Sequence, residues 1–185
     1  MEWGLIFFFL ISSGCENPFK LREAEPPTSG AISILEPVRS ENVLKNLKVV
    51  HNMLSIDDYM DIFSQDFLFI PDPTDKNAYP EVFSQAQPWD RDREHEFIRR
   101  LFDRDITSYI AFDATYLLEE TGAVDRYSYS YSMSIIHNKD APKQVEGRAE
   151  VYLKQDERRN WSIFRWEDER TEEEKSTWGE LRARF

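Results

Sequence analysis

The spacing of apolar side chains divides the chain into three parts. Before residue 40 the main feature is one short continuous apolar run, followed by a stretch without a period. Between residues 40 and 102 apolar side chains recur every three or four positions, which is the period of an amphipathic helix. From residue 107 they recur every second position, as in a half-buried strand. Helices followed by strands predict an α+β domain in which N-terminal helices pack on one face of an antiparallel sheet.

Three helices are expected in the middle part. The first begins at Ser40, the second follows Ser55 and the third follows Asp90, because each of these residues favours the N-cap position. A continuous apolar run at 67–70 predicts a strand between the second and third helices, and the prolines after it predict a long loop. The apolar stripe of the first helix consists of Val43, Leu44, Leu47, Val50 and Leu54.

The last part predicts a meander of long strands. The second strand alternates tyrosine with serine, which places its tyrosines on one face. In the last strand Trp161 and Ile163 are expected on one face. Phe164 and Trp166 are then expected on the other, so this strand should be covered on both sides. The four strands are predicted at residues 107–120, 124–137, 145–154 and 161–168.

The N-terminus carries the pattern of an export signal. Residues 5–11 are consecutive apolar residues. A membrane-spanning helix needs about 20 such residues, whereas a secretory signal needs about 7–15. Ser12, Ser13 and Gly14 lead to Cys15, the only cysteine, and this segment resembles a bacterial lipoprotein signal. The resemblance implies a lipid on Cys15 and a place in the bacterial cell envelope, on the periplasmic or outer-membrane side. The alternative is an incidental cysteine in an ordinary signal.

The chain is therefore expected to have four segments. Residues 1–15 form the signal that ends at the anchor cysteine, and residues 16–39, which are rich in proline, form a flexible tether. Residues 40–170 form the α+β domain, and residues 171–185 form a C-terminal tail. The tail has three apolar side chains that could dock on the domain: Trp178, Leu181 and Phe185.

Residues 40–170 resemble the nuclear-transport-factor-2-like (NTF2-like) proteins, which include the SnoaL-like group and share their layout with cystatin-like folds. The resemblance lies in the order of elements, the helix entry at Trp89, the tyrosine-rich strand and the closing pattern at residues 160–168. It implies a cone, in which a curved sheet wraps around the N-terminal helices. Some members are isomerases, dehydratases or cyclases that use an acidic or histidine base and tyrosine donors inside the cone. Non-enzymatic members often use the open sheet face to dimerise or bind partners.

Composition and charge exclude some classes of function. Hydrophobic residues make up 41% of the chain and aromatic residues 14%, which is enough for a real core. The formal net charge of -12 repels nucleic acid and anionic lipid headgroups, so no nucleic-acid partner is expected.

Few residues could carry chemistry. The histidines, His51, His95 and His137, fall on different predicted elements and lack the spacing of a metal site, so neither a metal nor a cofactor is expected. Asp113 is the single catalytic candidate. A carboxylate in an apolar pocket would have a raised pKa and could act as a base. The alternative is that Asp113 lies on the solvent side of an amphipathic strand.

Aromatic side chains are the candidates for a pocket or an interface, with core packing as the alternative. The candidates are Tyr109, Tyr127, Tyr129, Tyr131, Trp161 and Trp166. The preferred hypothesis is a membrane-anchored, non-catalytic module that binds a small apolar ligand or a protein, as a homodimer or with an envelope partner. The alternative is a small SnoaL-like isomerase or hydrolase that acts on an apolar substrate in the cone.

Overall fold

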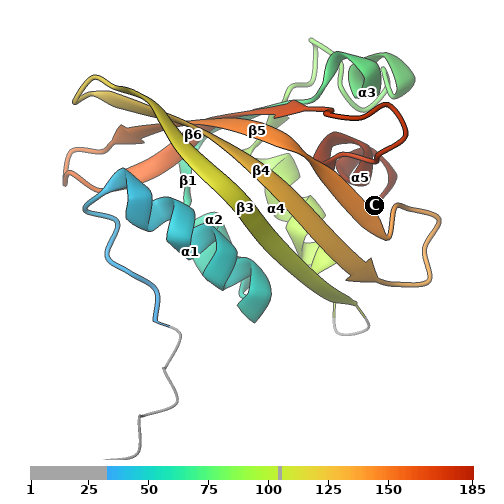
Figure 1. The fold of residues 1–185 in the computed structure, drawn as a ribbon, viewed down its shortest axis with the longest axis horizontal. Coiled ribbons are helices and arrows are strands. Elements are labelled where there is room, and N and C mark those ends of the chain that lie inside the picture. The colour runs from blue at the N-terminus through green and yellow to red at the C-terminus, as the bar shows by residue number, and fades with distance from the viewer. Residues whose placement is uncertain (1–32, 104–105) are drawn as a thin grey trace, which may run out of the picture. The chain divides into compact units, whose positions relative to one another are not determined.

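The computed structural model describes residues 33–103 and 106–185, apart from the side chains of residues 113 and 114 (Figure 1). These residues belong to one structural unit, Ile32–Phe185. The predicted signal, Cys15 and most of the predicted tether lie outside the described residues, so the lipid attachment stays a prediction. Within the described ranges, no helix has the length and apolar character needed to cross a bilayer.

A curved six-stranded sheet forms the frame of the fold, with the strand order β2-β1-β6-β5-β4-β3. The four strands from β3 to β6 form the predicted antiparallel meander. The first strand, β1, lies beside β6 and runs parallel to it. The sheet is therefore mostly antiparallel and open, and the α+β prediction is confirmed. The strands are β1 (Phe63–Ile70), β2 (Trp89–Asp90), β3 (Thr107–Glu120), β4 (Val124–Ile136), β5 (Gln144–Gln155) and β6 (Trp161–Glu169).

The three predicted helices are present, and two short ones join them. Among the longer helices, α1 packs on β3 and β6, and α4 packs on β1, so both lie against the sheet (Figure 1). Their apolar stripes are buried, as the helical period predicts. The helices are α1 (Ser40–Met53), α2 (Ile56–Met60), α3 (Pro73–Ala78), α4 (Arg91–Leu101) and α5 (Trp178–Arg184).

The predicted helix starts are correct for α4 and off by one residue for α1. The Asp90 side chain accepts a hydrogen bond from the backbone N–H of Arg93, as an N-cap does. At α1 the N-cap is Arg39, and Ser40 is the first helical residue. The Ser40 hydroxyl contacts Asp125 instead, with 2.5 Å between the two oxygens. A long-range polar contact has therefore replaced the local cap.

The prediction of a long loop after the first strand is wrong in part. Helix α3 lies within it, because Asp72 caps the backbone N–H of Thr74 and Pro73 occupies the first turn. The strand before it is also longer than expected and begins at Phe63 rather than Phe67. The start of β1 could not be recognised in the sequence because residues 64–66 are polar. They are polar because half of the side chains of β1 face solvent.

The prediction that β6 presents apolar side chains on both faces is wrong. Tyr152 pairs with Arg165 and Leu153 pairs with Ile163, so Phe164 is the extra residue of a β-bulge. The bulge reverses the alternation of side chains along the strand. Ile163 and Trp166 are consequently both in the core, whereas Phe164 is only half-buried.

Candidate ligand-binding site

The chain's own C-terminal segment, which contains α5, fills one end of the cone. We call this the inner end. Trp178 of α5 is fully buried. Its ring centre lies 5.8 Å from that of His51 in α1, 5.5 Å from Tyr131 in β4 and 5.1 Å from Trp166 in β6. The segment predicted to be a docking tail thus supplies the centre of an aromatic cluster. The chain's own aromatic side chains therefore occupy this region.

A buried ion pair fixes this segment from inside. The side chains of Arg182 in α5 and Glu94 in α4 are both 0% exposed and form two parallel hydrogen bonds, of 2.8 and 2.7 Å. The same carboxylate accepts hydrogen bonds from Tyr59 at 2.8 Å and Trp89 at 2.7 Å. The guanidinium carbon of Arg182 also lies 4.0 Å from the ring centre of Phe69. Because four donors already occupy Glu94, it cannot serve as a free base.

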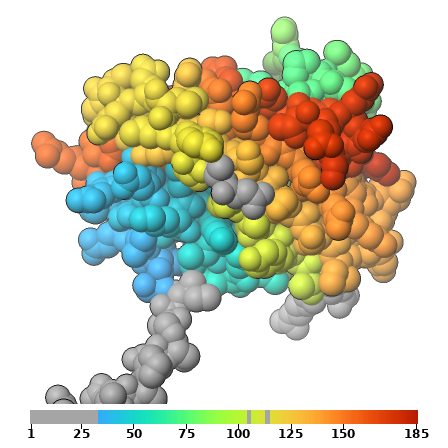
Figure 2. All heavy atoms as spheres, in the orientation of Figure 1, coloured from blue at the N-terminus to red at the C-terminus, as the bar shows by residue number. Residues whose placement is uncertain are grey.

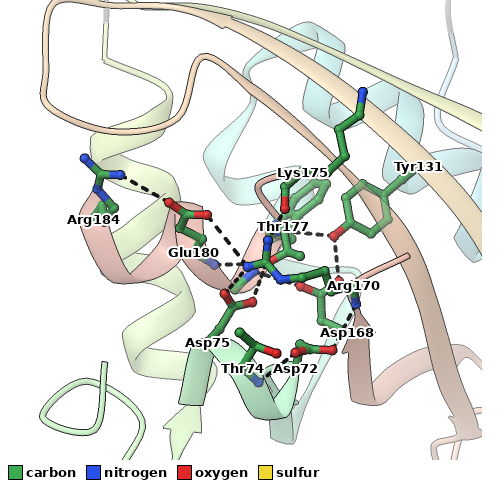
Figure 3. A network of polar contacts seen from close by, with 12 residues as sticks. Asp72, Thr74, Asp75, Tyr131, Asp168, Arg170, Lys175, Thr177, Glu180 and Arg184 are labelled. Atoms are coloured by element: carbon green, nitrogen blue, oxygen red, sulfur yellow. Dashed lines mark hydrogen bonds and ion pairs between the residues drawn. The ribbon is translucent and has the colours of Figure 1, made fainter. Parts of the chain in front are cut away.

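A second buried carboxylate, Asp168, anchors the start of α5 (Figure 3). One oxygen accepts the Tyr131 hydroxyl at 2.7 Å, and the other accepts the backbone N–H of Gly179 at 2.8 Å. The Tyr131 oxygen in turn accepts the backbone N–H of Trp178 at 2.9 Å. Burial raises the pKa of Asp168 to about 6, against the opposing effect of these hydrogen bonds. The value suits acid–base chemistry, but both oxygens are engaged and buried.

A third carboxylate, Asp75 of α3, completes the attachment. It accepts hydrogen bonds from Thr177 and Arg170, and Figure 3 shows these side chains converging from three segments. The helix comes so close here that a Cβ atom added to Gly179 would lie 2.9 Å from Asp75 Oδ2 and 3.2 Å from Pro71 Cβ. The close approach therefore requires glycine at this position.

The histidines do not form a site. Burial, with a smaller effect of the Arg182 charge, lowers the pKa of His51 to about 3, so this side chain is neutral. Its Nε2 atom lies 3.2 Å from the Ser108 hydroxyl. His137 is also buried and bonds to the backbone around it, whereas His95 is exposed. In the part of the chain that the structure describes, no three His, Cys, Asp or Glu side chains are arranged to hold a metal ion.

The other end of the cone, where α1 faces β3 and β4, is hollow by contrast, and we call it the outer end. A groove of about 430 Å³ lies between α1 and the strands β3 and β4. In Figure 2 the blue surface of α1 borders the yellow surface of β3. Its volume falls within the range of about 300–1,000 Å³ that is typical of small-molecule sites. Its apolar wall consists of Leu44, Phe112, Leu117, Tyr127 and Tyr129, and its polar lining of Glu41, Lys45, Lys48 and Thr115.

A break in the pairing of β3 shapes this groove. Phe112 pairs with Tyr131 and Ala114 pairs with Ser130, so one residue of β3 is unpaired between them. That residue is Asp113, the candidate base, whose side chain lies outside the described part of the structure. The shift reverses the alternation, which brings Thr115 onto the same side as Phe112.

The other aromatic candidates separate by face. Tyr127, Tyr129 and Tyr131 point to the helices and are buried, as are the two tryptophans of β6, Trp161 and Trp166. Tyr129 lines the groove, and its buried hydroxyl has no hydrogen-bond partner among the described residues. Tyr109 is 58% exposed and does not line the groove.

Sequence reasoning did not single out four polar residues of these two regions: Glu94 and Arg182 of the buried ion pair, and Lys45 and Lys48 of the groove. The pairing of Glu94 with Arg182 spans 88 residues, and no local pattern reports such a contact. The lysines did carry a signal, because their spacing of three places them on one side of α1, next to its apolar stripe.

The comparisons with known proteins support the fold. No protein-family model matches the sequence, and no curated protein matches it. Solved structures do match. A protein of Novosphingobium aromaticivorans, named as a candidate aromatic ring hydroxylase, superposes with a TM-score of 0.55 at 13% identity over 74% of this chain and 90% of its own. A candidate scytalone dehydratase of the same species gives 0.55 at 9% identity, over 76% and 91%.

An NTF2-like protein from Rhodospirillum rubrum, named as being of unknown function in nutrient uptake, gives a TM-score of 0.52 at 5% identity. The match covers 71% of this chain and 97% of that protein. At such identities the likeness concerns the fold alone. The predicted NTF2-like cone is therefore confirmed, and the neighbours include both named enzymes and proteins without an assigned activity.

Proposed function

We propose that this chain is a non-catalytic binding module that holds a small apolar molecule in the groove between α1 and β3. One observation carries the proposal: the interior of the cone is occupied by Trp178 and Arg182 of the chain itself, whereas the groove at the other end is hollow and mainly apolar. A hollow lined by apolar side chains with a few polar groups is the usual form of a ligand site.

The buried titratable groups favour binding over catalysis. A general base must reach the proton that it removes. Glu94 and Asp168 use both of their oxygens to hold α5, and His51 is enclosed by aromatic rings. Each of these groups has a structural task and none lines the groove.

The enzymatic alternative is an isomerase or hydrolase with Asp113 as its base. Its support is the place of Asp113 in the chain, between the groove-lining Phe112 and Thr115, and the enzyme names among the structural neighbours. The two proposals differ in one outcome. A binding module returns its ligand unchanged, whereas an enzyme converts it in a way that Asp113→Asn abolishes.

We further propose that the module is held in the bacterial envelope by a lipid on Cys15, as the signal pattern suggests. The test is fractionation of cells that express the full chain. Wild-type protein should stay with the membranes, and Cys15→Ser should move to the soluble fraction. Membrane association of the Cys15→Ser protein would refute the anchor.

The binding proposal is tested with the neutral apolar dye N-phenyl-1-naphthylamine, using a soluble form of the chain that begins at residue 16, directly after the proposed anchor residue Cys15. The dye should become fluorescent on binding, and Thr115→Trp should abolish the signal, because an indole at this exposed position fills the groove. Tyr116→Trp, at an exposed position that does not line the groove, is the matched control and should bind normally. Equal binding by both variants would place the dye elsewhere and refute the proposal.

A further inference from the structure

The charges along the groove are unevenly distributed. Lys45 and Lys48 lie one helical turn apart on α1, both line the groove, and both are exposed. Neither forms an ion pair within the described residues. Other lysines of this acidic chain do pair, as Lys154 does with Asp66 and Lys175 with Glu146. Two cations beside an apolar hollow are thus left available to a ligand.

The opposite end of the groove has the other sign. A second hollow of about 290 Å³ adjoins the first, since Glu41, Leu117 and Tyr127 line both. Its lining adds the carboxylates of Glu120 and Asp125 and one cation, Arg39, so carboxylates outnumber cations at this end. Asp125 is buried, and its Oδ1 atom has no hydrogen-bond partner among the described residues. An anionic group is repelled from this end and attracted to the lysines.

We propose that the ligand of the groove is an anionic amphiphile, namely a carboxylate on an apolar tail, with its head at Lys45 and Lys48. The inference rests on the proposed binding function and adds the class of ligand. The tail lies along the apolar wall, where Leu44, Phe112 and Leu117 supply most of the surface. The head stays at the exposed rim, where the ammonium groups reach it without being desolvated.

The net charge of -12 does not oppose this arrangement. At physiological ionic strength the Debye length is about 8 Å, so charges on the far side of the protein are largely screened. Within that distance the described side chains of the groove contribute most, and they include two lysines against Glu41. The concave shape of the groove favours a free amphiphile over a flat bilayer surface.

The experiment displaces the bound dye with three probes that share a tail and differ in the head: dodecanoate, dodecanol and dodecylamine. Dodecanoate should displace the dye at a concentration lower than dodecanol by between about 2-fold and 30-fold, the range that two exposed ion pairs supply. Dodecylamine should be the weakest. The advantage of dodecanoate should shrink when the salt concentration rises from 20 mM to 500 mM, about the range over which such pairs are screened.

The variant Lys45→Gln/Lys48→Gln should bring dodecanoate and dodecanol to equal affinity, because glutamine keeps the helix propensity and removes the charges. Lys143→Gln is the matched control. Lys143 is exposed and does not line the groove, so this variant should keep the preference for dodecanoate.

The outcomes separate the two proposals. If dodecanoate and dodecanol bind equally to the wild-type protein, the ligand class is wrong and the binding function stands. If dodecylamine binds best, the acidic end selects the head, and the inference is overturned. If no probe displaces the dye, the binding function itself fails. Sedimentation with phosphatidylglycerol vesicles that depends on both lysines would point to a membrane surface and overturn the free-ligand inference.

Discussion

The two ends of the cone use the same kinds of residue in opposite ways. At the inner end aromatic rings, carboxylates and an arginine pack against one another, and Glu94, Asp168 and Asp75 each meet donors from the C-terminal segment. At the outer end aromatic rings line an open groove, and its lysines have no acidic partner among the described residues. Buried charges are tolerated only when they are paired, and unpaired charges stay where water reaches them. The difference supports a structural role for the inner end and the proposed binding role for the outer end.

The largest change in stability is expected when the buried ion pair of the inner end is removed. Arg182→Ala leaves Glu94 buried without its counter-ion and should lower the free energy of unfolding by about 3–5 kcal/mol. Urea titration measures the change. The control is Arg184→Ala in the same helix, where the side chain is partly exposed and the loss should be about 0–1 kcal/mol. Equal losses in the two variants would show that Arg182 is not the buried anchor.

The next effect concerns pH. The folded-state pKa of Asp168 is raised to about 6, above its ordinary value near 3.8, so the folded protein binds this proton more tightly. The resulting stabilisation is complete below pH 3.8 and is lost as pH rises through 6, by up to about 3 kcal/mol. Unfolding of wild type and Asp168→Asn should be compared between pH 3.5 and 7 by urea titration, about the window of the shift. A stability difference between them that is constant with pH would contradict a raised pKa.

A smaller effect tests how closely α5 approaches α3. Gly179→Ala places a methyl group 2.9 Å from Asp75 Oδ2 and should cost about 1–3 kcal/mol. Gly122→Ala cannot serve as the control for an added methyl group, because the positive φ of Gly122, 77°, would strain any other residue. Ala183→Gly provides the comparison within α5, with a cost near 1 kcal/mol from helix propensity. An unchanged unfolding midpoint for Gly179→Ala would mean that the contact is looser than described.

The smallest effect is expected on the outer face of the sheet. Tyr109→Ser should change the free energy of unfolding by less than about 0.5 kcal/mol and leave dye binding intact, because the side chain is 58% exposed and outside the groove. Size-exclusion chromatography of the same variant tests the predicted interface role of Tyr109. A change from dimer to monomer would support that role, and loss of dye binding would contradict the placement of the groove.

The parts of the fold that follow from local pattern could be predicted, and those that depend on distant contacts could not. The alternation of β4 placed its tyrosines correctly, and Asp90 marked the start of α4. The bulge at Phe164 left no trace in the sequence, since one inserted residue preserves the composition of the strand while it reverses the faces beyond it. The role of Arg182 depends on Glu94, which is far away in the chain.

The candidate site was predictable only in part, for the same reason. Tyr127 and Tyr129 were candidates for a pocket or an interface, with core packing as the alternative, and both line the groove. The groove itself depends on how α1 crosses the break in β3, which is a tertiary feature. The filling of the inner cone depends on α5, which the sequence marked only as a tail with three apolar side chains.

The most direct test of the division between the two ends is an amide NMR titration of the soluble form that begins at residue 16 with dodecanoate. The account predicts shifts at Lys45, Lys48, Thr115 and Leu117, with the Gly179 amide and the Trp178 indole unchanged. Shifts at Gly179 and Trp178 would mean that the ligand displaces α5 and enters the cone, which would contradict the account.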